Sequence, residues 1–225
     1  MKRNILITLF VLLCTTISAQ KLSVSVLGDS YSTFEGFITP STNEMWYYAK
    51  AKEKRTDVTD VRQTWWWQYI HDNGYKLCVN NSWSGATISY TGYDGNDYSQ
   101  RSFITRLPNL GDPDIIFIFG ATNDDWAGTP MGDFQYDNFT YGDFYKFRPA
   151  MAYLLQQAQL RYPNVEIIVL INSDMKDSTA SSIKTICDHY NVKYIQLKEI
   201  DKISGHPSVK GMKQIAEQIK IGLGK

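Results

Sequence analysis

The sequence predicts an α/β fold in which a five-stranded parallel sheet lies between two layers of helices. Two observations support this prediction. Short apolar runs alternate along the chain with longer segments of helical periodicity. Strands that alternate with helices form crossover units, and such units make the sheet parallel. The chain has 225 residues, which suits one such domain with a full core and is too short for two.

The expected strands are apolar runs of the length usual for buried strands. They cover residues 22–27, 76–80, 114–119, 165–171 and 192–197. With right-handed crossovers, the natural order across the sheet is 2-1-3-4-5, as in flavodoxin-like three-layer folds. The carboxyl ends of all the strands then meet at one edge, which is where such sheets bind ligands.

The expected helices alternate with these strands and cover residues 64–72, 144–161, 178–190 and 208–221. The first contains Trp65, Trp66 and Trp67, which cannot share one helix face, so we expect one or two of them in the core. Two connections, residues 31–60 and 125–143, are longer than turns and rich in aromatic residues. Loops of this length in a compact domain are functional or disordered, and the aromatic content favours order. Whether they form a lid is left open.

Residues 1–19 have the pattern of a secretory signal peptide. Lys2 and Arg3 form a basic start, an apolar segment follows, and Ala19 closes a cleavage site of small residues. The apolar segment is too short to favour a transmembrane helix. We therefore expect one domain over residues 20–225, exported to the periplasm or beyond, with no stable membrane insertion after cleavage.

Composition and spacing exclude several classes of partner. Lys plus Arg and Asp plus Glu both number 23, so no overall field attracts nucleic acid. The mature chain keeps Cys78 and Cys187, near opposite edges of the expected sheet, and we expect two buried free thiols. The three histidines are scattered, without ligand spacing for a metal. No phosphate loop or dinucleotide fingerprint is present, so we expect no cofactor.

Four segments carry residues suited to acyl transfer, and each follows an element that ends at the same edge. Gly28-Asp29-Ser30 follows the first strand, Gly85 the second and Asn123 the third, and His206 precedes the last helix. A serine hydroxyl becomes a nucleophile when a base such as histidine takes its proton. A glycine N–H and an asparagine amide can stabilise the oxyanion that forms. Each segment is weak alone, because Gly-Asp-Ser is also common turn chemistry.

Taken together, these segments resemble the four blocks of the SGNH (GDSL-type) hydrolases, a family of esterases and acylhydrolases. The matching residues are Gly28-Asp29-Ser30, Gly85, Asn123-Asp124 and His206-Pro207, in the family's order and across nearly the whole mature chain. The resemblance implies Ser30 as nucleophile and His206 as base. It also implies that the Ser30 N–H, the Gly85 N–H and the Asn123 side chain form the oxyanion hole.

The chain departs from the family at two positions. The third block usually begins with Gly, and here Ala121 stands there, which is a small change. An acid usually stands three residues before the histidine, and here that position is Ile203. Either the site works as a Ser-His dyad, with a backbone carbonyl or water on the other ring nitrogen, or Asp201 or Glu199 replaces the acid. We favour the dyad.

The function expected from these residues is that of an exported serine esterase with an acyl-enzyme intermediate. The aromatic content favours a small-molecule or glycan ester as substrate, with O-acetyl groups on carbohydrate first. Trp83 and Trp126 adjoin catalytic blocks and are candidates for binding it. One alternative is a lipid or thioester acylhydrolase, which needs a long apolar groove. Another is a non-catalytic glycan-binding protein on the same scaffold.

Overall fold

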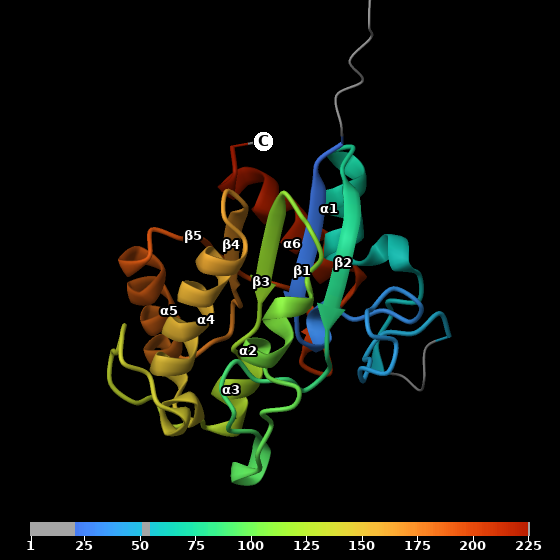
Figure 1. The fold of residues 1–225 in the computed structure, drawn as a ribbon. Coiled ribbons are helices and arrows are strands. Elements are labelled where there is room, and N and C mark those ends of the chain that lie inside the picture. Colours follow the sequence, from blue (N-terminus) through green and yellow to red (C-terminus); the bar gives the residue numbers. More distant parts are fainter. Residues whose placement is uncertain (1–20, 51–54, 225) are drawn as a thin grey trace, which may run out of the picture.

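The computed structural model describes residues 21–50 and 55–224, so the expected signal peptide lies outside the described residues. The sheet is parallel, and its order β2-β1-β3-β4-β5 confirms the prediction (Figure 1). Each predicted strand is found, with ends within two residues of those expected. The strands are β1 (Ser23–Gly28), β2 (Lys76–Ser82), β3 (Ile115–Phe119), β4 (Glu166–Ile171) and β5 (Lys193–Gln196).

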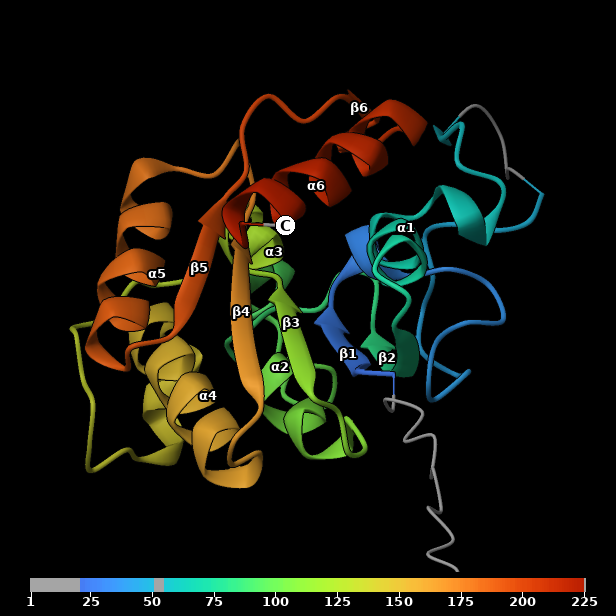
Figure 2. The same cartoon turned by 90° about the horizontal axis from the view of Figure 1, so that it is seen from above.

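Helices cover both faces of the sheet, with α1 and α6 on one face and α2, α4 and α5 on the other (Figure 2). The helices are α1 (Trp65–Asp72), α2 (Phe103–Arg106), α3 (Thr122–Ala127), α4 (Phe147–Arg161), α5 (Asp177–His189) and α6 (Val209–Gly222). Helices α2 and α3 were not predicted, because segments so short show no helical periodicity. Helix α4 begins later than expected, since Tyr141–Tyr145 forms a separate 3-10 helix.

The hydrophobic core lies in two clusters, one on each side of the sheet. Every residue of the central strand β3 is buried. Trp65 and Trp66 are fully buried, and Trp67 is partly exposed, as the helix geometry predicted. The cysteine prediction is only half right. Cys187 and Cys78 are both free thiols, but only Cys187 is buried, because Cys78 lies on the edge strand β2.

A short antiparallel hairpin precedes α6 at the carboxyl edge of the sheet. It pairs β6 (Lys202–Ile203) with β7 (His206–Pro207). Ser204 and Gly205 between them have positive φ angles of 51° and 75°, which suits a tight two-residue turn. His206 thus lies in a hairpin. Among the described residues, no helix is long and apolar enough to cross a membrane.

Candidate active site

Ser30 begins a 3-10 turn, Ser30–Ser32, directly after β1. The turn needs Gly28, because a Cβ there would come within 2.5 Å of the Ser82 hydroxyl oxygen. Asp29 stabilises the same turn, since its Oδ1 accepts a hydrogen bond of 3.0 Å from the Tyr31 N–H. As the first residue of the turn, Ser30 has a backbone N–H without an intrahelical partner. Its hydroxyl and its N–H are therefore both presented at the carboxyl edge.

His206 contacts Ser30 directly. Its Nε2 lies 2.9 Å from Ser30 Oγ, and its Nδ1 lies 3.0 Å from the Ser204 carbonyl oxygen. A carbonyl only accepts hydrogen bonds, so Nδ1 carries the hydrogen and Nε2 of the neutral ring carries the lone pair. The Ser30 hydroxyl then donates to Nε2. This is the geometry that a general base needs toward a serine nucleophile.

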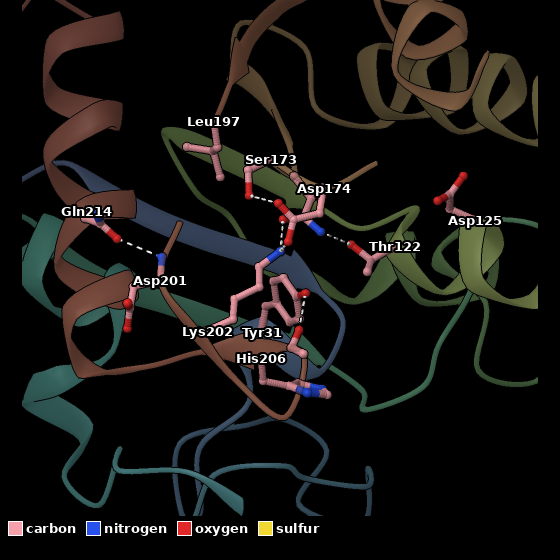
Figure 3. Close-up of polar contacts among 12 residues, drawn as sticks. Tyr31, Thr122, Asp125, Ser173, Asp174, Leu197, Asp201, Lys202, His206 and Gln214 are labelled. Carbon is pink, nitrogen blue, oxygen red and sulfur yellow. Dashed lines mark hydrogen bonds and ion pairs between the residues drawn. The ribbon is translucent and has the colours of Figure 1, made fainter. Parts of the chain in front are cut away.

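The two acidic candidates do not reach the imidazole. Asp201 Oδ2 accepts a hydrogen bond from the Ser208 hydroxyl, and Glu199 is exposed. Figure 3 shows the Asp201 carboxylate and the His206 ring on different sides of the hairpin. In the described part of the chain, no carboxylate hydrogen-bonds this ring. The structure thus contains the dyad arrangement, with the Ser204 carbonyl as the partner of Nδ1.

The surroundings of His206 favour its neutral form. Burial lowers the pKa of His206 to about 4, and the positive charges of Arg55 and Lys202 act in the same direction. The hydrogen bond to the Ser204 carbonyl acts against them. A neutral imidazole is ready to accept a proton over most of the pH range. Its protonated form is costly in this environment, and a nearby oxyanion would offset that cost.

Asn123 lies in the first turn of α3, and two hydrogen bonds fix its amide. Its Nδ2 donates to the Ala86 carbonyl at 2.9 Å, and its Oδ1 accepts from the Tyr93 hydroxyl at 2.8 Å. One amide hydrogen remains for a ligand. Ala121, at the position where a glycine is usual, has a φ of 70°. An alanine in this left-handed region costs about 1 kcal/mol, so the substitution is tolerated with some strain.

The loop after β2 brings Gly85 to the same edge. The Trp83 N–H donates to the Gly28 carbonyl at 3.1 Å, which ties this loop to the strand that carries Ser30. Gly85 has a φ of 79°, a conformation that favours glycine. Its N–H has no acceptor among the described residues. Together with the Asn123 amide, it is therefore a candidate oxyanion donor.

Two buried carboxyl groups support these loops. Burial raises the pKa of Asp29 to about 7 and that of Asp124 to about 6. Asp124 accepts hydrogen bonds from the Ile88 and Ser89 N–H groups, which holds the loop beyond Gly85 against α3. Both carboxyl groups accept hydrogen bonds from backbone N–H groups, so we assign them a structural role in these loops and no role in proton transfer.

The predicted substrate-binding tryptophans differ in their placement. Trp126 is 46% exposed and lies 6.0 Å from the His206 ring between centroids. Trp83 is half-buried, with the Arg101 guanidinium 5.7 Å from its ring centroid. Two residues that contact the site were not predicted. Trp46 stacks on His206, and the Tyr93 hydroxyl donates a hydrogen bond to Asn123. The aromatic content of the 31–60 connection was the only sequence signal for Trp46, and none pointed to Tyr93.

A parallel α/β sheet with a Ser-His pair at its carboxyl edge is the arrangement of a class of hydrolases. The profile of the GDSL-like lipase/acylhydrolase family matches residues 22–223, and the chain belongs to this family. Among curated proteins, none matches the chain.

Solved structures agree with this assignment. A protein of Bacteroides ovatus assigned to the GDSL-like lipases has 60% identity and a TM-score of 0.90, covering 91% of this chain and 99% of that one. A Bacteroides uniformis protein with the same assignment has 48% identity and a TM-score of 0.89, covering 91% and 96%. A family two carbohydrate esterase from Clostridium thermocellum, in complex with cellohexaose, has 15% identity and a TM-score of 0.63, covering 91% and 66%. This last likeness is one of fold alone.

Proposed function

We propose that the protein is an exported serine esterase that removes O-acetyl groups from carbohydrate through an acyl-enzyme intermediate. The observation that carries the proposal is the contact of 2.9 Å between Ser30 Oγ and His206 Nε2. The Ser204 carbonyl on Nδ1 leaves the Nε2 lone pair facing the hydroxyl. A buried serine beside a neutral imidazole is the pair that covalent ester hydrolysis requires.

In the proposed reaction, Ser30 Oγ bonds to the ester carbonyl carbon while its proton passes to His206 Nε2. The oxyanion accepts hydrogen bonds from the Ser30 N–H, the Gly85 N–H and the Asn123 amide. Collapse of the intermediate breaks the bond to the alcohol, which leaves with the proton from Nε2. Water then attacks the acyl-enzyme in the same way, and Ser30 regains its proton as the carboxylic acid departs.

The choice of an acetylated carbohydrate rests on the surface beside Ser30. Trp126 presents a half-exposed indole within ring-contact range of His206, and aromatic faces stack well on sugar rings. The chain also shares its fold with a carbohydrate esterase that was solved in complex with cellohexaose, and this likeness supports a carbohydrate substrate. Export is proposed from the signal-peptide pattern of residues 1–19.

The test is hydrolysis by the mature chain of p-nitrophenyl esters of increasing acyl length, together with acetate release from acetylated xylan. Ser30→Ala should abolish turnover and labelling by a fluorophosphonate probe. Ser181→Ala, an exposed serine of α5, is the matched control and should keep both. Faster turnover of long acyl chains than of acetyl would point instead to a lipid acylhydrolase. Xylan binding without turnover or labelling would point to a glycan-binding protein.

Export is tested separately, with the full-length chain expressed in a Gram-negative host. The protein should be recovered from the periplasm or the medium, with Gln20 as its first residue. Recovery of uncleaved protein from the cytoplasm would contradict export and leave the esterase proposal unaffected.

A further inference from the structure

The His206 imidazole is enclosed by aromatic rings as well as by its two hydrogen bonds. The Trp46 indole lies parallel to it, with centroids 3.5 Å apart and an interplanar angle of 7°. Tyr31 and Trp126 meet it edge-on, at centroid distances of 5.3 and 6.0 Å. Burial raises the pKa of the Tyr31 phenol, so that group stays neutral. The parallel pair is in full van der Waals contact, and any tilt of the imidazole toward this side meets the indole.

Trp46 and its neighbour Tyr47 are bonded to the two segments that supply the Ser-His pair. Its backbone N–H donates to Thr33 Oγ1 at 2.9 Å, and this hydroxyl donates to the Ser30 carbonyl at 3.0 Å. The phenol of the next residue, Tyr47, donates to the Pro207 carbonyl at 2.8 Å. The chain at residues 46 and 47 is therefore tied on one side to the nucleophile turn and on the other to the β6–β7 hairpin, which places the indole against the imidazole. It is held where it can act on the imidazole.

In a Ser-His-Asp triad, the acid orients the imidazole and stabilises the imidazolium that forms during the reaction. Here the Ser204 carbonyl fixes the tautomer, but as a neutral group it offers less to a positive ring than a carboxylate does. The face of an indole can supply what is missing. It restrains the plane of the ring by contact, and its quadrupole attracts a cation that lies over it.

This inference rests on the proposed esterase function. We propose that Trp46 is the positioning residue for His206 and takes over the part of the missing acid. Its face keeps Nε2 aimed at Ser30 Oγ, and it stabilises the imidazolium formed in each proton transfer. The role involves no group of the substrate, so it applies to every ester that the site accepts.

Two cationic side chains around the imidazole act against its protonation. The Arg55 guanidinium carbon lies 4.2 Å from the Trp46 ring centroid. Lys202 Nζ is bonded to Asp174 Oδ2 at 2.7 Å. Both cations lower the pKa of His206. The indole face is thus a contact that favours the charged ring within a positive environment.

Replacing Trp46 by Phe and by Leu separates stacking from burial, because both side chains are apolar and similar in size. Trp46→Leu should lower kcat for p-nitrophenyl acetate about 10-fold to 100-fold with little change in KM. Trp46→Phe keeps an aromatic face and should recover most of this loss. In NMR titrations, the pKa of His206 should be lower in the Leu variant than in the Phe variant. Circular dichroism checks that each variant folds, with Trp46→Met as a second non-aromatic variant.

The chain offers a matched control on α1. Trp67 stacks on His71 with centroids 4.6 Å apart and an interplanar angle of 10°, outside the Ser-His pair. Trp67→Leu and Trp67→Phe should keep the wild-type kcat. Equal kcat and equal His206 pKa in the Phe and Leu variants of Trp46 would overturn the proposal and leave Trp46 a packing residue. A wild type without turnover or labelling would refute the esterase function instead, and the NMR comparison would still decide whether the stack favours the imidazolium.

Discussion

The pH dependence of the wild-type enzyme follows from the burial of His206. In the proposed mechanism only the neutral imidazole accepts the Ser30 proton, so kcat/KM should fall as the pH drops through the pKa of His206, which burial lowers to about 4. At pH 5, a base with this pKa is about 90% neutral, whereas one at the ordinary pKa of 6.5 is about 3% neutral. The two cases differ by about 30-fold in activity at pH 5. We expect kcat/KM to stay near its plateau there.

The assay is kcat/KM for p-nitrophenyl acetate from pH 4 to 8, read at the isosbestic wavelength of p-nitrophenol so that its ionisation does not interfere. Asp29 and Asp124 also titrate in this range, so an NMR titration of the imidazole signals assigns the limb to His206. Circular dichroism at each pH confirms that the protein remains folded. An acid limb and a His206 titration both centred between pH 6 and 7 would refute the reasoning. They would mean that the ring is hydrated or paired with a carboxylate.

Three further predictions concern residues around the dyad. Asp201→Ala should change kcat/KM less than about threefold. It should lower the free energy of unfolding, measured with urea, by about 1 kcal/mol, because the Asp201 carboxylate accepts a hydrogen bond from Ser208, the N-cap residue of α6. Loss of activity in a folded variant would instead identify Asp201 as the acid. Tyr93→Phe removes one of the two hydrogen bonds that fix the Asn123 amide and should lower kcat for p-nitrophenyl acetate about 10-fold, whereas Tyr98→Phe should not. Equal kcat in the two variants would contradict this role. Burial raises the pKa of Asp29 to about 7 from 3.8, so the folded state binds the proton more tightly and stability falls as the pH rises from 4 to 7. Asp29→Asn should therefore be more stable than the wild type by about 4 kcal/mol at pH 8, with a difference that shrinks toward pH 4 in urea unfolding. A constant difference would contradict the assignment.

The sheet and the four blocks could be predicted because their signals are local. A buried strand shows as an apolar run of its own length, and the alternation with helices fixes the order of a doubly wound sheet. Ser30, Gly85, Asn123 and His206 follow elements that end at one edge, so their convergence was already implied by the order of the chain. Helices α2 and α3 were missed because a few residues carry no period.

The sequence by itself thus determined the fold and the pairing of Ser30 with His206, and the tertiary structure decided which groups contact the His206 ring. Two positive φ angles at Ser204 and Gly205 turn a carbonyl toward Nδ1 and leave Asp201 on another side of the hairpin. Trp46 reaches the imidazole across the fold from a long loop without secondary-structure periodicity. Contacts of this kind depend on backbone angles and on packing between segments distant in the chain. Neither leaves a pattern in the residues next to them.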